Sequence, residues 1–411
     1  MILEPKILEA IERFVIQSAH GNFYMYDTSV MQNKISALKN TLPKNIDIYY
    51  AMKANPHIEF LKTAKHAGAK GIEIASMGEG KKAIEAGFLP SEIIFTGPGK
   101  SEAELQWAVD NKIQKIHIES LIEAHRLNNI CAAQDYTQDI LVRVNPNFDI
   151  HGAQAKFSGD SSKFGIDQDL FFDLLPQILE LSHLNFKGLH VYAASGVLQA
   201  EDLLENCRRV FTIARELEAR YSDIQCDIID FGGGFGIDYL ENGNDFSVEF
   251  YAIELQKMIN SFDFTNRKLI IELGRYLTAD SGWYCTKILD IKTSLGKKQV
   301  ICSGGAHHFR RPVALNINHP ISIIPQNELK IFAGQESVHS EMSFVAGPLC
   351  NGAADKLAAK DIFIEKAEIG DIVVLGLAGA YGLSMSHIKF LSHAEPEEFF
   401  ILTQPYRLWN I

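Results

Sequence analysis

A lysine stands directly after a short apolar segment of the kind that forms buried strands. Lys53 lies within residues 49–56, which read YYAMKANP. An amine that apolar and aromatic side chains shield from water has a lowered pKa, so the neutral amine can attack a carbonyl group and form a Schiff base. In barrel enzymes, the active site lies at the carboxyl ends of the strands, where this lysine would stand. A solvated lysine at a strand end is the alternative interpretation.

A glycine cluster follows another apolar run. Residues 230–236 read DFGGGFG, and the backbone N–H groups near Gly233 and Gly234 can converge on an anion such as a phosphate. A tight turn between a strand and a helix is the alternative. Neither this spacing nor that of residues 97–101 (GPGKS) matches a nucleotide-binding glycine motif, so a nucleotide is not indicated.

A carboxylate and a guanidinium occur together near the end of the next apolar run. Residues 272–275 read ELGR, which places Glu272 and Arg275 close to Gly274. Alone, such a pair is compatible with a structural ion pair. Together with Lys53 and the glycine cluster, Glu272 and Arg275 predict a pyridoxal phosphate site. The lysine binds the aldehyde, the glycines and the arginine bind the phosphate, and the glutamate keeps the pyridine nitrogen protonated.

Eight apolar runs of strand length must position these groups. The runs are Asp47–Met52, Lys70–Ile74, Glu92–Thr96, Gln114–Glu119, Asp139–Val144, Lys187–Tyr192, Asp227–Phe231 and Leu269–Leu273. They are apolar on both faces and are separated by helical patterns such as Gly78–Gly87 and Ala200–Tyr221, which is typical of buried parallel strands with crossover helices. Eight such units predict an α/β fold of the TIM (β/α)8 barrel type. An open, doubly wound sheet is the alternative.

The character of the sequence changes after residue 278. Strand-like runs with little helical periodicity between them cover residues 283–293, 299–303, 371–377 and 397–403. We therefore expect a cofactor-binding barrel over residues 22–278, and a second, mostly β domain made of residues 1–21 with residues 279–411. The segment Asn22–Asp27 precedes the first barrel strand by a helical stretch, which lets the N-terminal residues pack on the β domain instead of entering the barrel.

Charge and cysteine usage exclude several classes of function. The chain has 411 residues with 39 basic and 51 acidic side chains, a net charge of −12, and no basic run. It therefore lacks the electrostatic footprint of a nucleic-acid or anionic-membrane partner, and we expect a small-molecule substrate. No stretch approaches the roughly 18 apolar residues of a membrane helix. We expect a cytoplasmic protein, because the N-terminal residues MILEPKILEAIERF are acidic and amphipathic instead of forming a basic region followed by an apolar one. The six cysteines form no CxxC pair, which disfavours a disulfide framework and a zinc ribbon.

Four motifs in sequence order resemble those of the fold-type III pyridoxal-phosphate decarboxylases, the diaminopimelate and ornithine decarboxylase family. They are YAMKAN at 50–55, ELGR at 272–275, GPLC at 347–350 and GAYG at 379–382. The resemblance covers nearly the whole chain. It implies an alanine racemase-like barrel with a β domain, pyridoxal 5′-phosphate as the cofactor, and Lys53 as the lysine that holds it. The implied activity is the α-decarboxylation of an amino acid.

The same resemblance implies further site residues and a homodimer. Ser195 and Tyr381 would contact the cofactor phosphate, and Glu73 would support the site behind the cofactor. Cys350 would reach into the site of the other subunit, because each site in this family lies between one barrel and the other chain's β domain. Cys350 or Lys53 would then return a proton to the α-carbon.

The sequence departs from the family pattern at the residue that stacks on the cofactor ring. The family's histidine should fall within residues 188–195, which read GLHVYAAS, and alignment on Ser195 places Tyr192 there. An aromatic tyrosine ring can still stack on the cofactor. His190, two residues earlier, is the alternative.

Further departures concern the substrate. Asn351 follows Cys350, where diaminopimelate decarboxylases carry a glutamate that receives a distal ammonium, and the next acid is displaced to Asp355. Residues 304–312, GGAHHFRRP, instead provide four potential cations near the family's substrate-binding arginine. These are His307, His308, Arg310 and Arg311. Such a cluster suits a polycarboxylate, and a solvated basic loop is the alternative.

This pattern is similar to the siderophore-biosynthesis branch of the family, which decarboxylates citryl-amino acid conjugates such as citryl-diaminopropionate or citryl-ornithine. Decarboxylation of an aminoacyl group on a carrier protein, or of diaminopimelate in lysine biosynthesis, is the alternative. A non-catalytic binding homologue would be expected to lose Lys53 or Cys350, and both are present. A metal-dependent barrel hydrolase, and with it any metal, is disfavoured because no His-x-His motif or carboxylate cluster is apparent at the strand ends.

Overall fold

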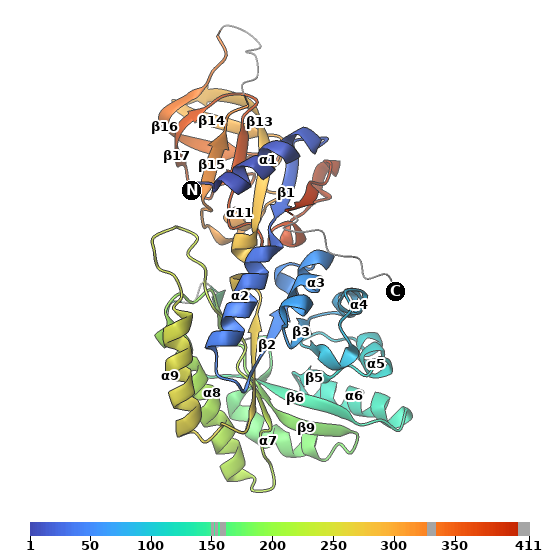
Figure 1. Ribbon diagram of the computed structural model, residues 1–411. Coiled ribbons are helices and arrows are strands. Elements are labelled where there is room, and N and C mark those ends of the chain that lie inside the picture. Colours follow the sequence, from blue (N-terminus) through green and yellow to red (C-terminus); the bar gives the residue numbers. More distant parts are fainter. Residues whose placement is uncertain (149–151, 153–154, 157–161, 327–333, 402–411) are drawn as a thin grey trace. The chain divides into compact units, whose positions relative to one another are not determined.

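The computed structural model describes residues 1–148, 152, 155–156, 162–326 and 334–401. The chain forms two compact units (Figure 1). The barrel unit comprises Gln32–Ile237 and Asn244–Leu277. The β unit comprises Met1–Met31, Asp238–Gly243 and Thr278–Ile411.

Eight parallel strands close into a ring in the barrel unit. They are β2 (Ile46–Ala51), β3 (Gly71–Ile74), β4 (Ile93–Phe95), β5 (Lys115–Ile118), β6 (Gln138–Asn145), β9 (Leu184–His190), β11 (Ile228–Asp230) and β12 (Lys268–Leu273). The pairings of β2 with β12 and of β5 with β6 complete the ring. The predicted (β/α)8 barrel is therefore confirmed, and the open sheet is excluded. Three short strands lie outside this ring. Strand β7 (Ala155–Lys156) pairs with β10 (Ala194–Ser195), and β8 (Ile166–Asp167) pairs with β6.

Serine side chains begin several of the helices that connect the barrel strands. Ser76, Ser101 and Ser120 each accept a hydrogen bond from the backbone N–H three residues later, which satisfies a free donor of the first helical turn. The helices, which flank the strands in Figure 1, are α2 (Thr28–Thr41), α3 (Ile58–Ala67), α4 (Met77–Glu85), α5 (Glu102–Asp110), α6 (Leu121–Ala133), α7 (Gln168–Leu179), α8 (Ala200–Arg220), α9 (Val248–Ser261) and α10 (Arg275–Thr278).

An apolar layer fills part of the barrel interior. Its members come from β2, β4, β6, β11 and β12, and they are Tyr49, Ile94, Leu141, Ile228 and Ile270. Filling by inward-facing side chains in layers is the normal construction of such a barrel. The interior is therefore a packed core, and a ligand site has to lie beyond this layer.

The β unit is built on a mixed sheet. Its strands are β1 (Asn22–Tyr26), β13 (Gly282–Ser294), β14 (Lys297–Cys302), β15 (Ile321–Ile324), β16 (Val338–Ala346), β17 (Ile362–Ala367), β18 (Ile372–Leu375) and β19 (Glu397–Phe400). The order β15-β18-β13-β14-β16-β17 forms the main path, and β1 joins it by pairing with β13 and β19. The predicted mostly β domain is present. The last two residues of the run predicted at 397–403 lie outside the described residues.

The N-terminal residues belong to the β unit. Helix α1 (Pro5–Gln17) buries Ile11 and Phe14 against Phe23 of β1 and Val374 of β18. Because β1 pairs with β13, residues 22–31 are not part of the barrel, and the boundary expected at residue 22 lies at residue 32 instead. The packing of the N-terminal residues on the β domain is as the sequence suggested.

Short elements complete the description. They are α11 (Arg311–Leu315) and the 3-10 helices η1 (Met52–Ala54), η2 (Pro90–Glu92), η3 (Ala279–Ser281), η4 (Gly352–Ala354), η5 (Leu383–Met385) and η6 (Phe390–Ser392). Within the described ranges, no helix combines the length and apolarity that crossing a membrane requires.

Candidate active site

The inner surface of the barrel changes from apolar to polar toward the carboxyl ends of the strands. Side chains two positions apart on a strand share a face, so the apolar layer is followed by a layer two residues further along. On β11 and β12 this step leads from Ile228 to Asp230 and from Ile270 to Glu272. The polar layer contains Glu73, Thr96, His117, Arg143, His190, Asp230 and Glu272, all of them buried.

Lys53 lies at the edge of this polar layer. It belongs to η1, directly after β2, and its Nζ is 2.7 Å from Glu73 Oε2. Thr96 at the end of β4 donates a hydrogen bond to the other oxygen of Glu73. Three neighbouring strands thus hold one lysine amine at the carboxyl end of the barrel, as the sequence predicted for its position. The amine is therefore paired with a buried carboxylate.

Tyr192 and His190 occupy different environments. Lys53 Nζ lies 5.4 Å from the centre of the Tyr192 ring. His190 is fully enclosed, and its Nε2 is 3.7 Å from Glu272 Oε1. A group attached to Lys53 therefore meets the face of Tyr192, whereas His190 points into the barrel. This placement favours Tyr192 as the stacking residue.

The glycine cluster forms a close turn after β11. Gly234 has a φ of +114°, which a residue with a side chain rarely adopts. A Cβ added at Gly233 would overlap the carbonyl oxygen of Glu272, so the turn packs directly on β12. Beside the turn, Arg275 donates a hydrogen bond of 3.5 Å to Ser195 Oγ. A guanidinium, a hydroxyl and a glycine turn therefore meet at one place, as an anion such as a phosphate requires.

Gly274 lets the segment that carries Arg275 pack closely against the segment that carries Lys53. A Cβ at Gly274 would stand 2.8 Å from Ala54 Cβ, so the β12 end approaches η1 closely. Glycine at this position lets Arg275 and Lys53 lie at the same end of the barrel. The structure thus brings together the lysine, the glycine turn and the ELGR motif.

Four buried side chains surround Glu272. One ring nitrogen from each of His117 and His190 and one carboxylate oxygen from each of Asp230 and Glu272 all lie within 4.8 Å of one another. Burial lowers the pKa of both histidines well below the usual value, so both imidazoles are neutral. Burial, followed by repulsion from Asp230, raises the pKa of Glu272 well above its usual value. The sequence had suggested that no carboxylates cluster at the strand ends, and this expectation, which was used against a metal-dependent hydrolase, is therefore wrong.

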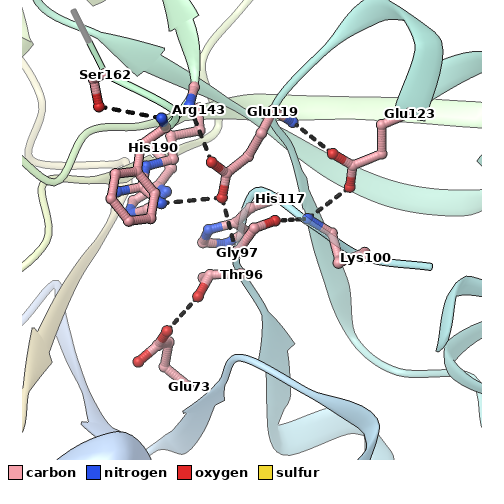
Figure 2. A network of polar contacts seen from close by, with 12 residues as sticks. Glu73, Thr96, Gly97, Lys100, His117, Glu119, Glu123, Arg143, Ser162 and His190 are labelled. Atoms are coloured by element: carbon pink, nitrogen blue, oxygen red, sulfur yellow. Dashed lines mark hydrogen bonds and ion pairs between the residues drawn. The ribbon is translucent and has the colours of Figure 1, made fainter.

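A second polar network borders this cluster (Figure 2). Glu119 Oε1 accepts hydrogen bonds from Arg143 (3.0 Å) and from the backbone N–H of Gly97 (2.8 Å). Lys100 Nζ lies 2.6 Å from Glu123 Oε1, and both side chains are buried. Each cation in this network is matched to its own carboxylate, so the network fixes the loops after β4, β5 and β6 without leaving a spare charge.

Cys350 and Asp355 lie in the loop after β16. Cys350 is exposed. Asp355 is buried, and its two oxygens accept hydrogen bonds from the backbone N–H groups of Ala306 and Leu349, each at 2.7 Å. Asp355 therefore connects the Cys350 loop to residues 304–309.

Tyr381 belongs to the β unit as well. It has a φ of +54°, in the left-handed region that residues other than glycine occupy rarely. Such a backbone conformation is often found at ligand sites. Its place in the GAYG motif fits this pattern.

The structure corrects the expectation that residues 307–311 provide four cations. Burial lowers the pKa of His307 to about 3 and that of His308 to about 4, so both are neutral near pH 7. Arg311 is buried beside His319, with 2.8 Å between Nη1 and Nε2. Arg310 is exposed at the surface. The segment is neither a cluster of four available cations nor a solvated basic loop.

A cavity of about 880 Å³ opens beside Arg310. His307, Asn351, His387 and Lys389 line it together with apolar groups such as Phe390. Arg310 and Lys389 are both exposed cations. The cavity can therefore receive a polar, negatively charged group through two cations, and apolar side chains line part of its wall.

Sequence reasoning missed His117, Asp230, Arg143 and Lys389. The first three carry a readable signal, because each stands at the inward-facing, carboxyl-terminal position of a predicted strand. Asp230 also begins the glycine motif. Lys389 gave no such signal, since it lies in an irregular segment after GAYG and is linked to Arg310 only by folding.

The barrel site fits pyridoxal phosphate on its own geometry. Lys53 supplies an amine at the strand ends, and the glycine turn beside Arg275 supplies a phosphate cradle. Glu272 Oε1 is a buried oxygen with no hydrogen-bond partner among the described residues, aimed into the barrel where a ring nitrogen would need an acceptor. These are the groups that this cofactor requires from a protein.

Comparison with known proteins agrees with this geometry. Residues 28–279 match the family model of the pyridoxal-dependent decarboxylases, pyridoxal binding domain. The 2-[(L-alanin-3-ylcarbamoyl)methyl]-2-hydroxybutanedioate decarboxylase of Staphylococcus aureus is 33% identical over 395 residues, covering 96% of this chain and 97% of that protein. The L-glutamyl-[BtrI acyl-carrier protein] decarboxylase of Niallia circulans is 31% identical over 400 residues, covering 94% and 90%.

A solved structure agrees as well. The crystal structure of diaminopimelate decarboxylase from Helicobacter pylori, complexed with L-lysine, aligns with a TM-score of 0.84 at 27% identity, covering 96% of this chain and 94% of that chain. The chain therefore belongs to the family of pyridoxal-dependent decarboxylases, and it is an enzyme that uses pyridoxal phosphate.

Proposed function

We propose that this enzyme removes the α-carboxylate of an amino acid whose distal end carries carboxylates, such as citryl-diaminopropionate or citryl-ornithine in siderophore biosynthesis. The observation that carries the proposal is the cavity of the β unit, where Arg310 and Lys389 stand near Asn351. The name of the Staphylococcus aureus relative describes an alanine unit joined through an amide to a hydroxybutanedioate, which is an amino acid with a dicarboxylate tail.

In this proposal, the polar layer of the barrel holds the reacting part of the substrate. When bound, pyridoxal phosphate takes up the electron pair that departing CO2 leaves on the α-carbon. Lys53 holds the cofactor aldehyde, and Glu73 orients Lys53 through their ion pair. Tyr192 covers one face of the ring, and Glu272 faces the ring nitrogen. The phosphate ligands that the barrel unit supplies are Ser195, Gly233, Gly234, Gly274 and Arg275.

In the shared-site dimer proposed below, the distal part of the substrate occupies the cavity of the β unit of the second copy. Arg310 and Lys389 bind its carboxylates through charge-assisted hydrogen bonds, which are stronger than neutral ones. The imidazole of His307 lines the same cavity and adds no charge to it, because burial lowers its pKa to about 3. Asn351 provides no negative charge, so a distal ammonium lacks the counter-ion that a glutamate would supply.

We further propose a homodimer with shared sites. Cys350 is an exposed thiol of the β unit, and in the dimer it serves the barrel of the second copy, where it or Lys53 returns a proton to the α-carbon. The exposure of Cys350, in contrast to the five buried cysteines, supports this arrangement, since its thiol is available to a second chain.

The cytoplasm is the compartment that we propose. All six cysteines are free thiols, and five of them are buried. Free thiols persist in reducing compartments, whereas secreted proteins tend to pair them.

A carrier-bound aminoacyl substrate is the second candidate. The Niallia circulans relative acts, by its name, on a glutamyl group attached to an acyl-carrier protein. The cations of the cavity would also attract the phosphate of a carrier arm. Free and carrier-bound substrates therefore have to be compared directly.

The test is CO2 release from a panel of substrates. We expect citryl-diaminopropionate or citryl-ornithine to give a higher kcat/KM than meso-diaminopimelate, ornithine, lysine or carrier-bound glutamate. Arg310→Gln should lower kcat/KM on the preferred citryl substrate by about tenfold to a hundredfold, because one charge-assisted hydrogen bond contributes roughly 1.5–3 kcal/mol.

Lys292→Gln is the matched control, since it removes an exposed cation of β13 that does not line the cavity. A higher kcat/KM on a free basic amino acid would contradict the proposed substrate class. Equal effects of Arg310→Gln and Lys292→Gln would show that the cavity does not receive the distal carboxylates.

A further inference from the structure

Asp230 and Glu272 form a buried carboxyl pair with no lysine or arginine in an ion pair with either of them among the described residues. They stand at the ends of the adjacent parallel strands β11 and β12, and they are 0% and 3% exposed. One carboxylate oxygen of Asp230 lies within 4.8 Å of one of Glu272. Two ionised carboxylates cannot donate a hydrogen bond to each other, so a single proton held by the two groups removes the repulsion between two buried charges.

The neighbouring cations are committed to other carboxylates. Charged and titratable groups facing the pair come from every strand around it, and they are Lys53, Glu73, Lys100, Lys115, His117, Arg143 and His190. Three cations have partners at 3.0 Å or less, namely Lys53 with Glu73, Lys100 with Glu123 and Arg143 with Glu119. The last two of these pairs are drawn in Figure 2.

The remaining neighbours do not neutralise the pair either. Lys115 lies at the start of β5, away from the carboxyl ends where the pair stands, and burial lowers its pKa to about 8. His117 Nε2 approaches Asp230 Oδ2 only to 4.0 Å, and His190 Nε2 approaches Glu272 Oε1 to 3.7 Å. Both imidazoles are neutral for the reason given above. Two adjacent, ionised carboxylates in such a site would repel each other strongly.

We propose that Asp230 and Glu272 share one proton before the cofactor binds, and that Glu272 passes this proton to the ring nitrogen of the incoming cofactor. The O–H bond of the carboxyl group breaks and an N–H bond forms. The ring gains one positive charge and the carboxyl pair gains one negative charge, so the total charge of the site is unchanged. Asp230 is thus a positioning residue that acts through Glu272. The inference rests on the proposed placement of the cofactor.

The proton count on binding tests this inference. Pyridoxine 5′-phosphate carries an alcohol in place of the aldehyde, so it fills the site without bonding to Lys53. Titration calorimetry of the full-length, cofactor-free enzyme in buffers of different ionisation enthalpy gives the number of protons taken from solvent. Asp230→Asn removes the acid whose repulsion adds to the raised pKa of Glu272, and the new amide can donate to Glu272, so the ionised form of Glu272 is favoured before binding. We expect this variant to take up about one more proton per site than the wild type.

Asp227→Asn is the matched control, because it removes an exposed carboxyl group just before β11. It should leave the proton count unchanged. An equal count in Asp230→Asn and wild type would overturn the inference. A merely structural role of Asp230 would alter affinity or stability without changing the number of protons.

A measurement on the unmodified enzyme covers the case in which Asp230→Asn fails to fold. Infrared difference spectra should show the band of a protonated carboxyl group that disappears when pyridoxine 5′-phosphate binds. Absence of that change would overturn the shared proton. Glu272→Gln separates this inference from the placement of the cofactor. If Glu272→Gln leaves the affinity for pyridoxine 5′-phosphate unchanged, the placement itself fails, whereas a loss of tenfold or more supports the placement whatever the proton count.

Discussion

Burial decides which side chains of residues 307–311 carry charge. His307 and His308 are enclosed, with their ring centres 3.9 Å apart, and two adjacent imidazolium ions would repel each other in a site that water does not reach. Arg310 reaches the surface, and its charge is available to a ligand. The same segment therefore combines a charged side chain with neutral hydrogen-bonding groups at the edge of one cavity.

The neutral state of these histidines makes the stability of the enzyme depend on pH. The folded-state pKa of His307, about 3, lies below the usual value of 6.5. Below about pH 6.5, the unfolded chain binds more protons than the folded chain, so the free energy of unfolding falls as the pH decreases toward the folded-state pKa. Between about pH 7 and pH 5, His307 should account for a loss of roughly 2 kcal/mol.

Urea denaturation of His307→Gln at these two pH values checks the prediction. The variant should lose about 2 kcal/mol less than the wild type over this range. His20→Gln, at an exposed histidine, is the control and should behave as the wild type does. An unchanged pH dependence in His307→Gln would mean that this imidazole is protonated in the folded enzyme.

Residue types alone did not reveal these charge states. The sequence shows two histidines and two arginines in five positions, which indicates a basic segment. Which of them are enclosed depends on β-unit residues as distant as His319 and His393, whose rings pack on this segment. The cofactor lysine was easier to predict, because Lys53 follows a strand that is readable from its own residues.

At the scale of elements, the alternation of strand side chains builds the site. Positions two residues apart share a face, so the apolar layer around Ile228 and Ile270 is followed by Asp230 and Glu272. The short turn after β11 then brings backbone N–H groups to the same end of the barrel. Strand ends therefore supply the polar side chains, and the turns between strand and helix supply the anion site.

The turn at Gly233 should be sensitive to a single methyl group. In Gly233→Ala, the new Cβ would overlap the Glu272 carbonyl oxygen, so the turn must move away from β12. Overpacking of this kind costs roughly 1–3 kcal/mol, and we expect the affinity for pyridoxal phosphate to fall by at least about tenfold.

Titration of the cofactor-free enzyme with pyridoxal phosphate, followed by fluorescence, measures this effect. Gly99→Ala is the control, because a Cβ at Gly99 meets nothing within 4 Å. If Gly233→Ala binds the cofactor as tightly as Gly99→Ala does, the glycine turn is not the phosphate cradle.

The elements of the barrel were predictable because each strand is apolar on both faces and is followed by a helical period. The β unit was less predictable. Strands β16 and β17 mix exposed polar and buried apolar residues, so they show no continuous apolar run. Strand β1 was assigned to the barrel because it precedes the first barrel strand in the sequence. Its partner β13 lies more than 250 residues later, and such a pairing leaves no local signal.

The proposed active site draws residues from two copies of the chain. The cofactor lysine belongs to the barrel unit, and Cys350 belongs to the β unit. We expect Lys53→Ala and Cys350→Ala each to be nearly inactive alone. When the two variants exchange subunits, half of the dimers are mixed and each mixed dimer contains one intact site, so up to about a quarter of the wild-type activity should return.

Subunit exchange is verified with differently tagged variants, and activity is followed as CO2 release. A mixture of two Lys53→Ala preparations is the control and should stay inactive. No recovery despite complete exchange would indicate that Cys350 serves its own barrel, and an active Cys350→Ala variant would indicate that Cys350 does not serve the site.

In the proposed function, Lys53 at the end of β2 holds the cofactor in the polar layer of the barrel. Borohydride reduction of the cofactor-loaded enzyme, followed by peptide mass mapping, tests this role of Lys53 most directly, because reduction fixes the cofactor on the lysine that carries it. We predict the phosphopyridoxyl group on the peptide that contains Lys53, and its loss in Lys53→Ala. The same group on a different lysine in the wild-type enzyme would contradict the account.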